Sequence, residues 1–214
     1  MGPSGGAQAA GLGSAASSAG WLSEREIAWS EPLDPGIRWR YRRSRSLLRQ
    51  RLAGLLGLAV EALPLHSPPG EAPQLRGDHG FLSLSHSGSG LLLAWSPWPI
   101  GVDLEDGRRP LAAASLLRRF FPPDEQRQLG GLGDEALRQA VLRSWVHKEA
   151  AIKWRRRQLA TELRFWRFDH ISGALLHTAE DLRPECLGAK AGPWLWAAVG
   201  RGVSLLAERG ARQD

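Results

Sequence analysis

The sequence predicts an α+β protein built from two lobes of similar construction. Three observations support this class: a helical pattern of leucines over 38–58, three short strand-like runs over 81–105, and further helical and then strand-like segments over 111–199. The order helix, strands, helices, strands is typical of α+β folds. We therefore expect an N-terminal lobe over 21–98 and a C-terminal lobe over 99–214, each an antiparallel sheet with packed helices.

The N-terminal segment contains a predicted tail and a predicted helix. Residues 1–20 are rich in Gly, Ala and Ser, which indicates a flexible tail, and they lack the basic and apolar regions of a signal peptide. Over 38–58, leucines recur at helical spacing, arginines fill the other face, and Gly57 lies near the expected end.

Three strand-like runs follow, at 81–85, 91–95 and 99–105. The gaps between them, HSGSG and SPW, have the length of hairpin loops. The sequence therefore predicts an antiparallel meander of three strands.

The C-terminal lobe is predicted to begin with two further helices. One covers 111–121 and ends at Pro122-Pro123, and the next runs from Asp134 as its N-cap to about residue 154. Four further runs are predicted to be strands: 163–168, 174–178, 194–199 and 203–208.

Composition limits the partners and the compartment. The chain carries 28 basic and 22 acidic residues, a net charge of +6, which favours an anionic partner such as nucleic acid, a phosphorylated cofactor or an acidic protein. The single cysteine, Cys186, excludes an intramolecular disulfide framework and fits the reducing cytoplasm. The sequence contains no run of eighteen or more apolar residues, so it predicts no membrane-spanning helix.

The stretch LSLSHSGSG places polar groups at the end of a predicted strand. Alternation puts Ser83 and Ser85 on one face, and His86 follows at the strand end. Hydroxyl, imidazole and backbone N–H groups at such a position can bind a phosphate. A polar hairpin turn would give the same pattern.

The run 99–105 places two carboxylates, Asp103 and Glu105, on one face of a predicted strand. Like charges side by side destabilise a sheet. Either that face is solvated, or it binds a cation such as Mg²⁺, which takes carboxylates, water and phosphate oxygens as ligands.

The helix over 144–154 carries Trp145, Glu149 and Lys153 at intervals of four, on one face. Glu149 and Lys153 could form an ordinary surface ion pair, which contributes little to stability. The large aromatic ring of Trp145 on the same stripe indicates instead that the stripe is partly buried.

Taken together, these stretches resemble the Sfp-type 4′-phosphopantetheinyl transferases. The similarity lies in LSLSHSG, GVDLE and WVHKEAAIK, in this order and spacing, and in RRFFPPDE, which resembles the family's Arg-Phe-Phe-x-x-x-Glu stretch. It covers about residues 38–200. The resemblance implies two pseudo-symmetric α+β lobes with the active site in the cleft between them.

The resemblance also implies an activity, a metal and partners. Such enzymes transfer the phosphopantetheine arm of coenzyme A to a serine of an acyl or peptidyl carrier protein and release 3′,5′-ADP. Asp103, Glu105 and Glu149 would surround Mg²⁺, and Glu149 would accept the proton of the serine. We expect a cytoplasmic monomer that binds no nucleic acid and no membrane.

The remaining candidate residues are implied by the same resemblance. Lys153 and His86 would neutralise phosphate charge during transfer. The expected cofactor-binding residues are Arg45 near the 3′-phosphate, Ser85, His86, Lys148 and Lys153. Glu125 matches the acid of the RRFFPPDE stretch.

Two alternatives stay open, one from a departure from the family pattern and one from the basic stretches of the chain. The stretch 70–73 lacks the lysine of the family's Gly-Lys-Pro, for which Arg76 is a candidate substitute. This favours, as one alternative, a relative of the same fold with weak or no activity. The other is a basic nucleic-acid-binding module that uses the arginines of 38–51 and 154–157, whose affinity would fall steeply with salt.

Overall fold

The structure is a computed structural model that describes residues 8–10 and 21–203. Its helices are α1 (Glu24–Ser30), α2 (Pro35–Leu56), α3 (Ala113–Phe120), α4 (Pro123–Leu129), α5 (Asp134–Trp154), α6 (Leu159–Glu162) and a 3₁₀ turn (Leu163–Phe165). Its strands are β1 (Gln8–Ala10), β2 (Leu65–His66), β3 (Gln74–Leu75), β4 (Phe81–Ser87), β5 (Gly90–Ser96), β6 (Ile100–Asp106), β7 (Trp166–Phe168), β8 (Leu175–His177), β9 (Cys186–Ala191) and β10 (Trp194–Gly200).

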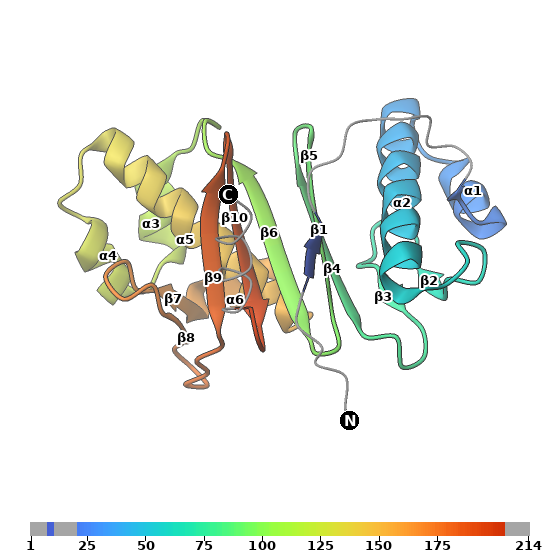
Figure 1. The fold of residues 1–214 in the computed structure, drawn as a ribbon. Coiled ribbons are helices and arrows are strands. Elements are labelled where there is room, and N and C mark those ends of the chain that lie inside the picture. Colours follow the sequence, from blue (N-terminus) through green and yellow to red (C-terminus); the bar gives the residue numbers. More distant parts are fainter. Residues whose placement is uncertain (1–7, 11–20, 204–214) are drawn as a thin grey trace, which may run out of the picture.

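Two three-stranded antiparallel sheets form the centre of the molecule, with helices on their outer sides (Figure 1). The strand orders are β1-β5-β4 and β6-β10-β9. Helix α2 lies beyond the first sheet, and α3, α4 and α5 lie beyond the second. The predicted α+β class, with antiparallel sheets and packed helices, is confirmed.

The predicted three-stranded meander is only partly correct. Strands β4 and β5 pair as a hairpin, with Ser87 opposite Gly90. Strand β6 leaves this sheet and pairs with β10 along its whole length. Gap length permits a hairpin but does not require one, and β6, with both faces largely buried, gains a full partner strand in β10.

Alternate serines of β4 join the two sheets where β4 and β6 lie side by side. Ser83 Oγ accepts a hydrogen bond from the backbone N–H of Val102 at 2.9 Å, and Ser87 Oγ accepts one from that of Asp106 at 3.2 Å. Ser85, between them, also bonds to β6 through its side chain. We call Ser83, Ser85 and Ser87 the serine ladder. The hydroxyls of Ser83 and Ser87 satisfy β6 amides in place of a backbone partner, and that of Ser85 donates to the Asp103 carboxylate.

Helix boundaries agree closely with the helical patterns. Helix α2 ends at Leu56, and Gly57 forms a left-handed C-cap with φ of 66°. Helix α3 ends before Pro122-Pro123, as predicted. Helix α5 begins at Asp134, but Gly133 is the N-cap, so the predicted capping role of Asp134 is wrong.

Two further predictions need correction, and a third lies mostly outside the residues that the structure describes. Residues 8–10, within the predicted tail, form β1 and pair with β5. The predicted strand 163–168 is a 3₁₀ turn over its first half, because Leu163–Phe165 continue the helical path of α6. For the predicted strand 203–208, Val203 lies in a turn and the remainder lies outside the described residues.

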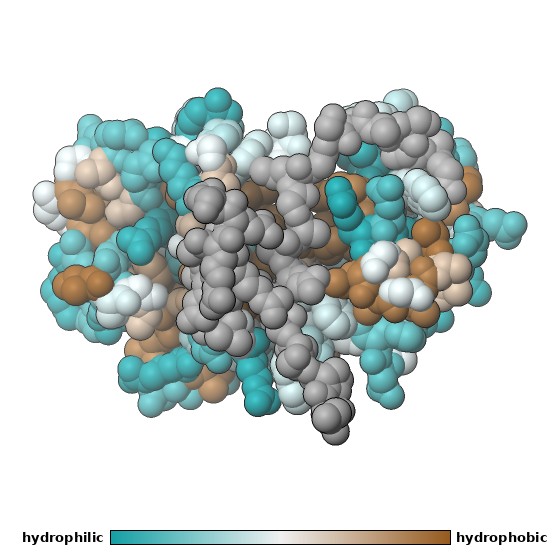
Figure 2. All heavy atoms as spheres, in the orientation of Figure 1, coloured by the Kyte–Doolittle hydropathy of each residue, from teal (hydrophilic) through white to brown (hydrophobic). Residues whose placement is uncertain are grey.

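On the face shown in Figure 2, hydrophilic side chains spread over both outer helical layers and apolar ones form small separate patches. The exposed large apolar side chains of the described residues include Trp39 and Ile171. None of the helices in the described ranges combines the length and apolar composition that a membrane crossing requires.

The backbones of helix α5 and strand β6 lie in close contact at Gly101. A Cβ atom built on Gly101 would lie 2.0 Å from the Ala150 carbonyl oxygen and 2.3 Å from the Trp154 backbone nitrogen. Only a residue without a side chain allows this contact between helix and strand. Gly101 therefore sets the distance between β6 and the second half of α5, where Glu149 and Lys153 lie.

We predict that Gly101→Ala lowers the free energy of unfolding by about 1–3 kcal/mol or more, because the methyl group overlaps helix backbone that cannot move alone. Urea unfolding of the purified protein measures this change. Gly54→Ala is the matched control, since a Cβ at Gly54 meets nothing within 4 Å in the interior of α2. Equal stability of the two variants would contradict the proposed contact.

Candidate active site

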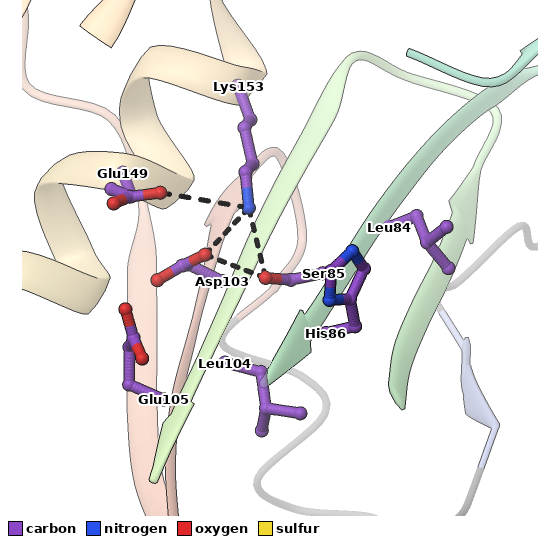
Figure 3. A pocket seen from close by; sticks show the side chains of 8 residues that line it. All are labelled: Leu84, Ser85, His86, Asp103, Leu104, Glu105, Glu149 and Lys153. Carbon is purple, nitrogen blue, oxygen red and sulfur yellow. Dashed lines mark hydrogen bonds and ion pairs between the residues drawn. The ribbon is translucent and has the colours of Figure 1, made fainter. Parts of the chain in front are cut away.

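A cavity of about 260 Å³ opens between β4, β6 and α5 (Figure 3). It lies where the serine ladder meets the face of β6 that looks toward α5. Its lining residues are Leu84, Ser85, His86, Asp103, Leu104, Glu105, Glu149 and Lys153.

Asp103 is the most deeply buried of the acids in this cavity, with 2% of its surface exposed. Its Oδ1 atom accepts hydrogen bonds from Ser85 Oγ at 2.7 Å and from Lys153 Nζ at 2.6 Å. Its Oδ2 atom is buried and has no hydrogen-bond partner among the described residues. The alternative of a solvated strand face is therefore wrong for Asp103.

Glu149 and Lys153 reach the cavity from consecutive turns of α5 (Figure 3). The ammonium of Lys153 lies 3.0 Å from Ser85 Oγ and 4.0 Å from Glu149 Oε2. The side chains of Glu149 and Lys153 are 20% and 32% exposed, so they do not form an ordinary surface pair. The predicted stripe on α5 therefore turns Glu149 and Lys153 toward the carboxylates of β6.

Glu105 completes the group of carboxylates and is held at both oxygens. Ser87 Oγ donates a hydrogen bond to Oε2 at 3.1 Å, and Arg109 Nη1 donates one to Oε1 at 2.9 Å. The Glu105 side chain is 12% exposed. Its position thus depends on the end of β4 and on the turn after β6.

The three acids fit a hard divalent cation. One carboxylate oxygen from each of Asp103, Glu105 and Glu149 lies within 4.8 Å of the others. The unpartnered Oδ2 atom of Asp103 is a buried acceptor that lacks a donor, which a cation would satisfy. Carboxylate oxygens are the ligands that Mg²⁺ and related ions prefer.

The electrostatics of the site also indicate crowding of negative charge. Burial, first, and then the charge of Asp103 raise the pKa of Glu149 to about 7, against a lowering effect of Lys153. Burial likewise raises the pKa of Glu105, although Arg109 opposes this. The ionised forms of both groups are therefore less stable here than in water.

Two of the predicted site residues, Arg45 and Lys148, do not line this cavity. Lys148 is fully buried, 2.7 Å from Glu125 Oε2, with its ammonium 3.4 Å from the centre of the Phe121 ring. One residue along a helix turns the side chain by about 100°, so Lys148 points away from the face that carries Glu149. Its expected role in cofactor binding is not supported by this position.

Arg45 lies on α2 and is also buried. Its guanidinium lies 4.8 Å from the centre of the Tyr41 ring, and its Nε atom donates to the Ser67 carbonyl at 3.3 Å. His86, in contrast, lies at the cavity with an exposed side chain, directly after Ser85.

Sequence reasoning missed three residues that shape the site. These are Gly101, which allows α5 to approach, and Ser87 and Arg109, which hold Glu105. The alternation of serines along β4 extends to Ser87, and this pattern in the sequence could have identified Ser87 as a site residue. Nothing in the sequence indicated that Arg109, beyond the end of β6, turns back toward Glu105.

The carboxylates and the lysine lie together at the junction of two sheets, an arrangement that could hold a cation together with an anionic group such as phosphate. Residues 99–195 match the family model of the 4′-phosphopantetheinyl transferase superfamily. One curated relative, 4′-phosphopantetheinyl transferase HetI of Nostoc sp. strain PCC 7120, is 36% identical over 125 residues. The aligned region covers 56% of this chain and 52% of HetI, about half of each protein. These matches bear out the predicted resemblance at the level of the 4′-phosphopantetheinyl transferase superfamily, over about half of the chain.

We predict that Glu149→Gln stabilises the protein in chelator-containing buffer. Between pH about 4.5 and 7, the folded state binds more protons at Glu149 than the unfolded chain does, so this carboxyl lowers stability progressively as the pH rises. The gain from glutamine is thus absent near pH 4.5 and complete above pH 7, where it reaches about 1–3 kcal/mol. Urea unfolding at pH 5 and pH 8 measures the difference.

Glu135→Gln, on the same helix, is the matched control for this measurement. Hydrogen bonds from Arg138 lower the pKa of Glu135 to about 2, so its removal at neutral pH should change stability in the opposite direction. If both variants changed stability with the same sign, the crowding of charge around Glu149 would be refuted.

Proposed function

We propose that the protein transfers the 4′-phosphopantetheine arm of coenzyme A to a serine hydroxyl of an acyl or peptidyl carrier protein, releasing 3′,5′-ADP. One observation carries the proposal. Asp103, Glu105, Glu149 and Lys153, at the positions of the family's motifs, line one cavity. The match of residues 99–195 to the transferase superfamily supports it.

The arrangement of the lobes fits the same proposal. We infer two pseudo-symmetric lobes, 21–98 and 99–214, with coenzyme A bound in a cleft at their junction. The cavity is lined by β4 of the first lobe and by β6 and α5 of the second, which supports this placement.

Asp103, Glu105 and Glu149 would together hold Mg²⁺. When bound, the ion would offset the charge of the three carboxylates and of the coenzyme A diphosphate, the usual electrostatic contribution of Mg²⁺ in phosphoryl transfer. The buried Oδ2 atom of Asp103 is the ligand atom that the protein leaves without another partner.

Lys153 and His86 would act on the phosphates themselves, and Ser85 would support Lys153 in the cofactor pocket. The carrier serine oxygen forms a bond to the β-phosphorus, and the bond from that phosphorus to the bridging oxygen breaks, so that 3′,5′-ADP leaves with the electron pair. Positive charge from Lys153 and a donor at His86 would stabilise the negative charge that develops on these oxygens. Ser85 would orient Lys153, which it contacts at 3.0 Å.

Glu149 is the candidate to accept the proton of the carrier serine, directly or through a water molecule. Its side chain is the most exposed of the three acids, at 20% against 12% for Glu105. Both oxygens of Glu105 are already bound, by Ser87 and Arg109. A base must lie within hydrogen-bond reach of the proton that it takes.

Arg45 and Lys148 enter the proposal in different ways. Coenzyme A is long, so a residue outside the cavity can bind its 3′-phosphate, and Arg45 stays a candidate for this contact. Lys148, closed off by its ion pair with Glu125, would act on the site only by anchoring α5.

We further infer that the protein acts as a cytoplasmic monomer and that its anionic partners are coenzyme A and an acidic carrier protein rather than nucleic acid. The carrier protein could belong to fatty-acid, polyketide or nonribosomal peptide synthesis. The panel of carriers in the experiment below distinguishes these pathways. A weakly active relative of the same fold is the competing proposal, favoured by the missing lysine at 70–73.

The test is to incubate the protein with coenzyme A, Mg²⁺ and a panel of apo carrier proteins and to measure the carrier mass. We expect one phosphopantetheine group to be added to at least one carrier, and the addition to stop when a chelator removes the metal. An unchanged mass for every carrier would refute the transferase proposal and favour the inactive relative.

We also predict that Asp103→Asn and Glu149→Gln each reduce transfer by about 100-fold or more, because each removes a charged group that would face the metal. The initial rate of carrier modification at saturating coenzyme A measures this effect. Asp134→Asn, an exposed acid at the start of α5, should keep the wild-type rate. Full activity of both cavity variants would rule out the three-acid metal site.

A further inference from the structure

The last residue of β4, Ser87, connects this strand to an acid of the metal site. Its Oγ atom lies 3.1 Å from Glu105 Oε2 and 3.2 Å from the backbone nitrogen of Asp106. It belongs to the serine ladder but does not line the cavity.

The direction of these two hydrogen bonds is fixed by their chemistry. The Asp106 N–H can only donate, so Ser87 Oγ accepts that bond. A hydroxyl has one proton to donate, and the carboxylate of Glu105 can only accept it. Ser87 therefore presents its single O–H to Glu105, and the backbone of β6 holds the hydroxyl in that orientation.

The other oxygen of Glu105 is held from the turn that follows β6. Arg109 Nη1 donates to Oε1 at 2.9 Å. Arg138 of α5 donates to the carbonyl oxygens of Gly107 and Arg109 at 2.8 and 3.1 Å and so anchors this turn. Glu105 is thus fixed by a neutral donor on one side and a cation on the other.

We propose that Ser87 is a positioning residue that holds Glu105 in the orientation required to bind the divalent cation. The inference rests on the proposed metal site. A preset carboxylate loses less rotamer entropy when it binds an ion, and partners that hold metal ligands contribute typically 10- to 100-fold to metal affinity. Ser87 does so without adding a positive charge that would repel the cation, unlike Arg109.

Ser83 offers a matched comparison within the same ladder. Its hydroxyl also accepts a hydrogen bond from a backbone N–H of β6, that of Val102 at 2.9 Å. It shows no bond to an acid of the cavity among the described contacts. Loss of either hydroxyl removes one bond from a backbone N–H of β6, but only loss of Ser87 also removes a bond to a candidate metal ligand.

The test measures binding of Mn²⁺ to the purified, metal-depleted full chain. Mn²⁺ is a probe for sites that suit Mg²⁺, and its unbound fraction is read by electron paramagnetic resonance, with and without coenzyme A. The variants are Ser87→Ala, Ser83→Ala and Ser87→Thr, which keeps the hydroxyl. Thermal unfolding of each variant confirms that it is folded.

We expect Ser87→Ala to weaken Mn²⁺ binding about 10-fold, Ser87→Thr to restore most of the affinity, and Ser83→Ala to bind like the wild type. Equal affinity of Ser87→Ala and the wild type would overturn the inference, as would an equal loss in Ser83→Ala. If the wild type itself bound no Mn²⁺, the metal site and this inference would both fail. Mn²⁺ binding without transfer to any carrier would refute only the proposed function.

Discussion

The site depends on one electrostatic constraint: three carboxylates are held close together in a partly buried cavity, where their charges are less well solvated than in water. Their oxygens lie within 4.8 Å of one another, and Lys153 is the cation that reaches the cavity among its lining residues. Lys153 and Arg109 supply two positive charges against three carboxylates. Burial, with repulsion between the acids as a smaller contribution, raises the pKa values of Glu105 and Glu149. The fold therefore accepts a local cost in stability at the place where a dication would be bound.

The packing of α5 on β6 is what imposes this constraint. The helix carries Glu149 and Lys153 on the face toward the strand, and Gly101 lets the two backbones come close. On another face of the same helix, Lys148 forms a fully buried ion pair with Glu125. Removal of one member of such a pair is costly because it leaves the other charge unpaired. Two neighbouring residues of one motif thus have different roles: Glu149 lines the cavity, and Lys148 anchors the helix.

Much of the fold and of the site could be predicted from the sequence, because periodicity reports which side chains share a face. It identified α2, α5 and β4, and it placed Asp103 and Glu105 on one side of β6. It could not tell that β6 changes sheets, since a hairpin-length gap is compatible with either path. It also could not separate Lys148 from Glu149 in role, or find Arg109, because both depend on which surfaces the tertiary structure brings opposite them.

The serine ladder has a consequence for how the two halves of the molecule are connected. Between ordinary strands the hydrogen bonds are fixed by the backbone, and they form or break as a cooperative row. Here each link is one hydroxyl that can rotate about its own Cα–Cβ bond. The contact between β4 and β6 therefore rests on side-chain hydrogen bonds and on the apolar cluster beside them, so a single substitution can change it while the backbone pairing within each sheet stays intact.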